Sequence, residues 1–314
     1  MKVVCVTGCL GFIGSHFTRA CLRAGWKVWG IDKKTYAAHL SLLDEFRKDP
    51  SFRFLEADIT TMDHLFDVDC VINFAAETHV DNSIMDSGRF TRTNIMGVEN
   101  LLELIRGKRN YEMPLFVQIS TDEVYGDIVA GNHTELDPLH PSNPYSASKA
   151  AADMLIMGWH RTHNVPFLIV RPTNNYGVNQ YPEKLIPKAV KYLTLGKKIP
   201  LHGDGSYIRN WLHAEDTAAA VLHLIDKGDR NRIYNVSGNY EAPNRDVIAR
   251  LLRCYFGRDV ALEEYAQFNF VRMGEDVRYS LDDSAIRALG WNNTKMFDHE
   301  LQKIVDFYKS TFVW

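Results

Sequence analysis

Three features are scarce in this chain of 314 residues: cysteine, long apolar runs and an excess of one charge. The five cysteines are scattered and no two form a Cys-x-x-Cys pair, so neither a metal site nor a disulfide framework is expected. No stretch approaches the roughly 18 apolar residues of a membrane span. The net charge of −3 gives no general attraction to nucleic acid or to an anionic membrane. We therefore expect a cytoplasmic protein with no metal, nucleic-acid or membrane partner.

The chain does contain a regular alternation of short apolar runs and helical stretches. Such an alternation predicts the α/β class, with a doubly wound, Rossmann-type parallel sheet. The expected strands are residues 3–7, 27–32, 52–56, 70–74, 115–120 and 167–170, and the main expected helices are residues 15–24, 91–106 and 146–163.

The composition of the chain changes after Pro172, where prolines and glycines become frequent. Residues 221–226 and 233–236 are interpreted as a return of the chain to the sheet. We therefore predict an NAD-binding domain over residues 1–173, rejoined near residues 210–237. A smaller, partly interleaved lobe over residues 174–314 is expected to bind the substrate.

A glycine-rich loop, Gly8-x-x-Gly11-x-x-Gly14, lies between the first expected strand and a helix. The glycines allow a tight turn, and N–H groups at the helix start can bind a pyrophosphate. Asp32, at the end of the next strand, can accept hydrogen bonds from ribose hydroxyls, and its charge favours NAD over NADP. The expected cofactor residues are Gly8, Gly11, Phe12, Ile13, Gly14, Asp32, Lys33, Asp58, Ile59, Ala75, Ala76, Tyr145 and Lys149.

Tyr145 and Lys149 are four residues apart at the start of an expected helix, so they share one face. In a dinucleotide fold, the lysine ammonium and the nicotinamide cation would both favour the tyrosinate. They would lower the tyrosine pKa from about 10 toward neutrality. Tyr145 could then accept a proton from a sugar hydroxyl while hydride passes to NAD.

Two adjacent acids, Asp122 and Glu123, follow the expected strand at residues 115–120. Ligands of open α/β sheets bind at the carboxyl ends of the strands, so we expect these acids in the cofactor cleft. Oxidation of a hexose at C4 acidifies its C5 hydrogen, which one carboxylate can remove while the other carboxyl protonates the departing C6 hydroxyl. Thr121 can hydrogen-bond the C4 oxygen. The pattern predicts oxidation, loss of water and re-reduction of one sugar.

At these residues the chain resembles the nucleotide-sugar 4,6-dehydratases of the extended short-chain dehydrogenase/reductase family, over nearly its whole length. Those acting on dTDP-glucose are the most similar. The triplet at residues 121–123 is the most specific match, because related epimerases lack the acid pair and UDP-glucuronate decarboxylases resemble Thr-Ser-Glu there. The other matching segments are residues 32–37, 75–81, 120–126, 145–149, 171–177, 183–187 and 203–211.

The resemblance implies a homodimeric hydro-lyase that recycles NAD internally and acts on a nucleotide-diphosphate sugar. It implies that Tyr145 is the base for C4 oxidation, supported by Lys149, with Thr121 on the C4 oxygen. Asp122 would be the acid for loss of water, and Glu123 would remove the C5 proton. Residues 91–106 and 146–163 would pair across a two-fold axis. The residues implied in nucleotide-sugar binding are His79, Asn174, Lys184, Arg209, Asn244 and Arg272.

The chain departs from the family pattern in two places. The family's Asp-Arg-Pro-Gly-His-Asp segment corresponds to residues 271–276, where Glu275 replaces the histidine, and residues 127–143 form a shorter stretch than in typical bacterial members. The base (dTDP or UDP) and the sugar (glucose or an N-acetylhexosamine) therefore stay open. The runner-up is a nucleotide-sugar 4-epimerase or another sugar-modifying relative, and the acid pair argues against a plain epimerase. A non-enzymatic dinucleotide-binding protein is the alternative from a different class.

Overall fold

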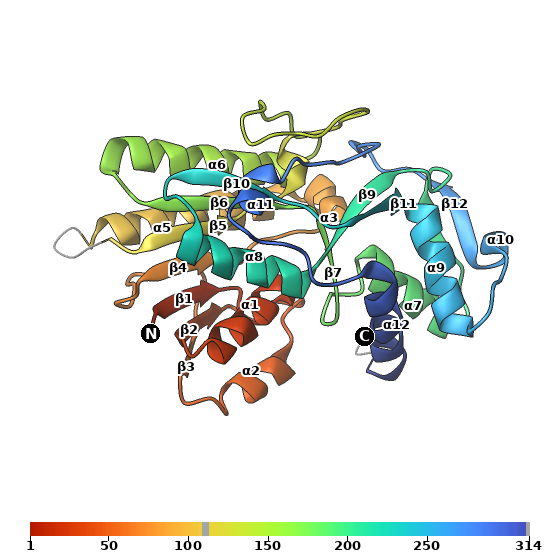
Figure 1. Ribbon diagram of the computed structural model, residues 1–314, viewed down its shortest axis with the longest axis horizontal. Helices are drawn as coiled ribbons and strands as arrows, with labels where there is room; N and C mark the ends of the chain where they lie inside the picture. The colour runs from red at the N-terminus through yellow and green to blue at the C-terminus, as the bar shows by residue number, and fades with distance from the viewer. Residues whose placement is uncertain (109–112, 312–314) are drawn as a thin grey trace.

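A seven-stranded parallel sheet forms the larger part of the protein (Figure 1), whose computed structural model describes residues 1–108 and 113–311. The strand order is β10-β6-β5-β4-β1-β2-β3. The chain adds strands toward one side of the sheet from β1 to β3 and toward the other side from β4 onward, so the order reverses between β1 and β4. Ligands of such sheets bind beside that reversal, at the carboxyl ends of the strands. The strands are β1 (Val3–Thr7), β2 (Lys27–Asp32), β3 (Phe52–Glu56), β4 (Cys70–Asn73), β5 (Leu115–Ile119), β6 (Phe167–Pro172) and β10 (Arg232–Val236).

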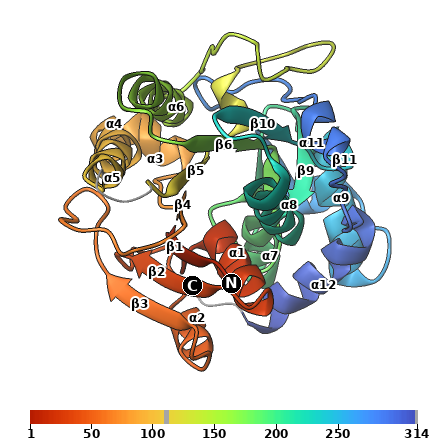
Figure 2. The same cartoon turned by 60° about the vertical axis from the view of Figure 1, so that its left-hand side comes forward.

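Helices cover both faces of this sheet (Figure 2). Side chains alternate along a strand, so Val4 and Val6 of β1 pack in the core beneath α1 and α8, whereas Cys5 packs in the core beneath α5 and α6. The elements on the two faces are α1 (Phe12–Arg23), α2 (Leu40–Phe46), α3 (Val80–Met85), α4 (Ser87–Phe90), the π-helical segment η1 (Thr91–Met96), α5 (Gly97–Arg106), α6 (Pro144–His163) and α8 (Ala214–Lys227).

The predicted α/β class and doubly wound sheet are confirmed. Residues 233–236 lie in β10, as expected, but the strand predicted at residues 221–226 is wrong because these residues belong to α8. Their apolar side chains, Val221, Leu224 and Ile225, recur with helical spacing and pack in the core with α1. The short apolar run alone did not distinguish a strand from a buried helix.

Smaller sheets extend from one end of the large sheet, at the right of Figure 1. In the order β11-β9-β7, β9 pairs antiparallel with β11 and parallel with β7, while β8 and β12 form a separate parallel pair. A second apolar core joins them to four helices. The elements are β7 (Asn174–Tyr176), β8 (Ile199–His202), β9 (Ile208–His213), β11 (Tyr240–Pro243), β12 (Ala266–Phe270), α7 (Leu185–Thr194), α9 (Asn244–Phe256), α10 (Leu262–Tyr265) and α12 (Phe297–Ser310).

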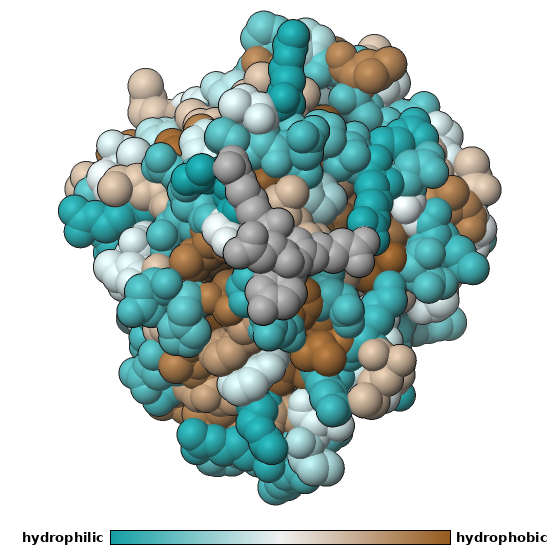
Figure 3. All heavy atoms as spheres, turned by 90° about the vertical axis from the view of Figure 1, so that its left-hand side faces the viewer, coloured by the Kyte–Doolittle hydropathy of each residue, from teal (hydrophilic) through white to brown (hydrophobic). Residues whose placement is uncertain are grey.

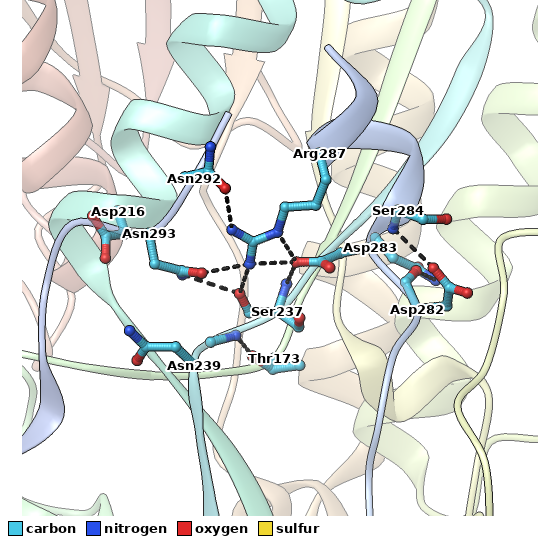
Figure 4. Close-up of polar contacts among 12 residues, drawn as sticks. Thr173, Asp216, Ser237, Asn239, Asp282, Asp283, Ser284, Arg287, Asn292 and Asn293 are labelled. Atoms are coloured by element: carbon cyan, nitrogen blue, oxygen red, sulfur yellow. Dashed lines mark hydrogen bonds and ion pairs between the residues drawn. The ribbon is translucent and has the colours of Figure 1, made fainter. Parts of the chain in front are cut away.

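A polar cluster around Arg287 of α11 (Ser284–Ala288) ties the C-terminal part of the chain to the large sheet (Figure 4). Arg287 Nη2 donates to Asp283 Oδ2 at 2.9 Å, and it also donates to Asn293. The Ser237 backbone N–H donates to the same Asp283 oxygen at 3.2 Å, and Asn293 Nδ2 donates to Ser237 O at 3.1 Å. Ser237 directly follows β10, so the cluster anchors the last segments against the edge strand. The predicted division at residue 173 stays a prediction.

Over the described ranges, no helix is long and apolar enough to cross a membrane, and no three His, Cys, Asp or Glu side chains gather in a way that could hold a metal ion. All five cysteines are free thiols. The side of the molecule at the left of Figure 1 is mixed, with hydrophobic areas between hydrophilic side chains (Figure 3).

Candidate active site

Two adjoining cavities lie where the carboxyl ends of the parallel strands meet the smaller sheets. The first has a volume of about 280 Å³, and every predicted cofactor and catalytic residue lines it. The second is lined by all six residues predicted to bind the nucleotide sugar. Glu123, Asn174 and Lys184 line both cavities, so the structure brings the two predicted sets of residues together.

The glycine loop is packed too tightly for side chains. Gly8 has a φ of +67°, and a Cβ at this position would lie 2.8 Å from the Ala75 backbone N. A Cβ at Gly14 would lie 2.1 Å from Gly8 O. Gly11, the N-cap of α1, provides no side-chain acceptor for the first N–H groups of the helix. Free N–H groups at a helix start beside a cavity fit a pyrophosphate, as the motif predicts.

Asp32 is held at the end of β2 by two backbone N–H groups: Lys34 N donates to Oδ1 at 2.8 Å and Leu10 N donates to Oδ2 at 3.1 Å. Lys33 Nζ lies 3.4 Å from Asp58 Oδ2, and Lys34 Nζ pairs with Glu56. Because both lysines have other acidic partners, Asp32 keeps a negative field toward the cavity. Such a field fits ribose hydroxyls and repels a 2′-phosphate.

The Thr-Asp-Glu triplet forms the turn η2 (Asp122–Val124) immediately after β5. Thr121 Oγ1 accepts from Glu123 N at 3.3 Å and donates to Asp122 Oδ1 at 3.0 Å. Asp122 is only 2% exposed, and its Oδ2 has no hydrogen-bond partner among the described residues. Burial and the neighbouring Glu123 raise the pKa of Asp122 to about 7. The carboxyl can therefore carry a proton near neutral pH.

Glu123 has different surroundings from its neighbour. Asn143 Nδ2 donates to Glu123 Oε2 at 3.4 Å. Burial raises the pKa of Glu123, while the charges of Lys184 and Arg209 act in the opposite direction. Cations favour the ionised form; Lys184 acts on Glu123 and Arg209 acts on both acids, so the two carboxyls have unequal surroundings.

Tyr145 and Lys149 lie in the first turns of α6, which Asn143 caps by accepting from Ser146 N at 3.0 Å. The Tyr145 side chain hydrogen-bonds Thr121, and Lys149 Nζ donates to the Ile119 carbonyl at 2.6 Å. This arrangement brings the predicted base and its lysine to the acid triplet.

Burial, with Glu123 and Asp122 in the same direction, raises the pKa of Tyr145 above its usual value. The predicted lowering depends on a bound nicotinamide cation, so it stays a prediction. Burial also lowers the pKa of Lys149 to about 8, against the charge of Asp153.

Glu275, the acid that departs from the family pattern, lies at the second cavity and binds the side chains of His202, Arg209 and Arg272. It accepts from His202 Nδ1 at 2.8 Å and from Arg209 Nη2 at 3.0 Å, and it lies 3.1 Å from Arg272 Nη1. Asp81 binds Arg272 from the other side, with Arg272 Nε to Asp81 Oδ1 at 2.5 Å. The two arginines are thus fixed in place at the cavity wall.

Several buried polar atoms at the second cavity have no hydrogen-bond partner among the described residues. Buried polar groups in proteins are almost always hydrogen-bonded, so this set indicates a polar ligand. The atoms are His79 Nδ1, Asn174 Oδ1, Gln180 Oε1, Trp211 Nε1 and Asn244 Oδ1.

Three residues that line the second cavity were not predicted from the sequence: Asn143, Gln180 and Trp211. Asn143 had a visible signal, since an asparagine before Pro-Tyr-Ser is a typical helix N-cap, but its contact with Glu123 depends on the tertiary structure. Gln180 carries no motif, and Trp211 ends the matching segment 203–211 without any role predicted for it; both line the cavity.

A sequence model of the family described as GDP-mannose 4,6 dehydratase matches residues 5–304. The chain belongs to the nucleotide-sugar 4,6-dehydratase family. It is 40% identical, over 336 residues, to a dTDP-glucose 4,6-dehydratase of Haemophilus influenzae, with 98% of each chain covered. It is 39% identical, over 325 residues, to a trifunctional UDP-glucose 4,6-dehydratase, 3,5-epimerase and reductase of Arabidopsis thaliana. That match covers all of this chain and 48% of the plant protein, so the chain spans about half of it.

Among solved structures, the chain superposes on the dTDP-glucose 4,6-dehydratase DesIV of Streptomyces venezuelae, crystallised with NAD bound. The TM-score is 0.92 at 37% sequence identity, covering 99% of this chain and 98% of the other. The family and the fold predicted from the sequence are therefore confirmed.

Gly14→Ala is expected to lose most of the bound dinucleotide, because the new Cβ would meet Gly8 O and displace the loop. The measurement is the amount of dinucleotide released per chain from denatured, freshly purified protein. Gly158→Ala in α6 is the matched control, since nothing lies within 4 Å of a Cβ there. Equal dinucleotide content in Gly14→Ala and wild type would contradict the binding role of the loop.

Proposed function

We propose that the protein is an NAD-dependent 4,6-dehydratase that converts dTDP-glucose or UDP-glucose to the 4-keto-6-deoxy sugar and water. The observation that carries the proposal is the buried acid pair beside the Tyr-Lys pair. A plain dehydrogenation or epimerisation at C4 needs a base and a hydride acceptor, and two further carboxyls in the cavity have no part in it. Loss of water across C5 and C6 needs both an acid and a base.

The residues around the first cavity support NAD as the cofactor: a glycine loop without side chains at a helix start, and the Asp32 carboxyl, held at the end of β2 by two backbone N–H groups. When bound, NAD would accept hydride from C4 and return it to C6. Gly8, Gly11 and Gly14 would hold the pyrophosphate, and Asp32 would hold the adenosine ribose.

Each proton step has a residue of suitable chemistry. Tyr145 takes the proton of the C4 hydroxyl as hydride leaves C4. Glu123 takes the C5 proton, Asp122 protonates the departing C6 hydroxyl, and Glu123 returns its proton to C5 as hydride reaches C6. One cycle therefore leaves Tyr145 with one more proton and Asp122 with one fewer. Thr121 hydrogen-bonds both side chains and is the direct path between them.

The second cavity fits the nucleotide diphosphate. Arg209, Arg272 and Lys184 offer cationic donors, and Asn174 and Asn244 each offer an unpartnered oxygen. Guanidinium groups bind phosphate oxygens well because their donors match the anion's geometry. His79, at the same cavity, would complete the substrate residues. Glu275 offsets part of the positive charge of Arg209 and Arg272. The diphosphate would therefore meet two arginines that are fixed in place and whose charge is partly neutralised.

Purified protein is expected to remove one molecule of water from dTDP-glucose or UDP-glucose without added cofactor. The reason is that the reaction is redox-neutral and the hydride returns to the same sugar. Mass spectrometry of the nucleotide sugar checks this, with a panel that also includes GDP-mannose and UDP-N-acetylglucosamine. Recovery of an isobaric epimer would favour the 4-epimerase, and no reaction with any sugar would favour a non-enzymatic dinucleotide-binding protein.

The proposed roles predict that two variants fail at different steps. Tyr145→Phe should block NADH formation, because no base removes the hydroxyl proton. Asp122→Asn should slow loss of water by about 10²–10⁴-fold, because an amide cannot supply the proton. In a single turnover followed by NADH absorbance, the transient NADH should persist longer in Asp122→Asn. Asp44→Asn, an exposed acid on α2, is the control. Wild-type turnover in Asp122→Asn would remove Asp122 from the acid role.

We also propose a homodimer that pairs η1 and α5 with α6 across a two-fold axis. Large apolar side chains are exposed on these elements: Met96 is 53% exposed, Met154 is 54% exposed and Met157 is 39% exposed. Exposed apolar side chains that share neighbouring helices are typical of subunit interfaces.

Sedimentation velocity is expected to give a dimer at micromolar concentration and a monomer for the double variant Met154→Glu, Met157→Glu, because charges would be buried at the interface. Leu136→Glu, at a 95% exposed leucine outside these helices, should stay dimeric. A wild-type monomer, or an unchanged dimer in the double variant, would contradict the proposed interface.

A further inference from the structure

A fully buried ion pair lies behind the active site and is not used by the chemistry above. Asp153 of α6 is 0% exposed and Arg171 of β6 is 2% exposed, and Arg171 Nε donates to Asp153 Oδ2 at 3.0 Å. A buried ion pair is weak evidence for stability, because apolar side chains of similar volume often do as well. The pair therefore calls for a role other than holding the fold together.

The first connection of this pair is to Lys149. Asp153 follows Lys149 by four residues, so the two side chains lie on one face of α6. Lys149 is 3% exposed, and its ammonium makes one hydrogen bond, to the Ile119 carbonyl. Burial disfavours the ammonium and lowers the pKa of Lys149 to about 8, and the charge of Asp153 opposes this. Among the described residues, Asp153 is the charged group that counters the effect of burial on Lys149.

The second connection is to the turn that carries the acids. Ser120 Oγ donates to the same Asp153 oxygen at 2.9 Å, and Arg171 Nη1 donates to Tyr125 Oη at 2.7 Å. Ser120 directly precedes Thr121, and Tyr125 lies two residues after Glu123. One ion pair thus holds both ends of the segment that contains Thr121, Asp122 and Glu123.

We infer that Asp153 is a positioning residue for the reaction: it places a carboxylate on the face of α6 that carries Lys149 and, through Arg171 and Ser120, fixes the turn that bears the acid pair. The inference rests on the proposed function of Lys149 as the support of the Tyr145 base. Asp153 touches neither cofactor nor substrate, since it lines neither cavity.

The charges around Lys149 set the sign of the expected effect. The charge of Asp153 acts on Lys149, and Arg171 on β6 pairs with Asp153. Asp122 and Glu123, on the turn after β5, act on Tyr145. Asp153→Asn removes the negative charge nearest in sequence on the same helix face, so the ammonium becomes less stable and Lys149 loses its proton at lower pH. Activity that needs the ammonium is then lost at a lower pH than in the wild type.

The test is the pH profile of kcat/KM above neutrality for the holoenzyme. Asp153→Asn should move the basic limb to lower pH by about one unit or more, as expected when an opposite charge is lost from a buried pair. Tyr125→Phe should slow the reaction and leave the basic limb in place, because it loosens the turn without changing charge. Dinucleotide content and the melting temperature of each variant are measured alongside.

A lower melting temperature of Asp153→Asn with an unmoved basic limb would overturn the inference, since a merely structural role predicts that result. If Asp153→Asn does not fold, Asp153→Ser decides instead, because it also removes the negative charge. Its basic limb should move in the same direction, and an unmoved limb again overturns the inference.

Lys149→Met separates this inference from the proposed function. Loss of NADH formation in Lys149→Met, together with an unmoved limb in Asp153→Asn, would overturn only the role of Asp153. Normal turnover of Lys149→Met would overturn the proposed role of Lys149 and, with it, this inference.

Discussion

The site depends on holding two adjacent carboxyl groups out of water at the end of β5. Burial raises the pKa of both Asp122 and Glu123, and like charges so close disfavour each other. The structure resolves this by giving the two acids unequal surroundings. Arg209 favours the ionised form of both acids, Lys184 adds to this at Glu123, and one oxygen of Asp122 lacks any partner among the described residues. The proposed division into one acid and one base rests on this inequality.

The parallel sheet explains how distant segments contribute to one reaction. Strands β1, β2, β4, β5 and β6 all end at the same edge, so the glycine loop, Asp32 and the acid pair face one cavity although many residues separate them. The smaller sheets close the other side and bring Arg209 and Arg272 to the adjoining cavity. A substrate that fills both cavities, as proposed, would place its sugar beside Glu123, which lines both.

Local patterns predicted what depends on local structure. The glycine loop, the strand ends and the spacing of Tyr145 and Lys149 identified the sheet, the cavity and the family, because each motif has one position in such a fold. Patterns could not predict the helix at residues 221–226, where a short apolar run fits either structure. Nor could they predict the pKa of Tyr145 or the partners of Glu275, because both depend on burial and on charges from remote segments.

The central claim is that this chain oxidises, dehydrates and re-reduces one sugar without releasing the hydride. The most direct test uses a mixture of NDP-glucose deuterated at C4 and unlabelled NDP-glucose, with product masses and positions of label read by mass spectrometry and NMR. The account predicts that deuterium from C4 appears at C6 of the same molecule and that the product has lost one water. Product without deuterium at C6, deuterium shared between the two sugars, or a C4 epimer that keeps its water would contradict it.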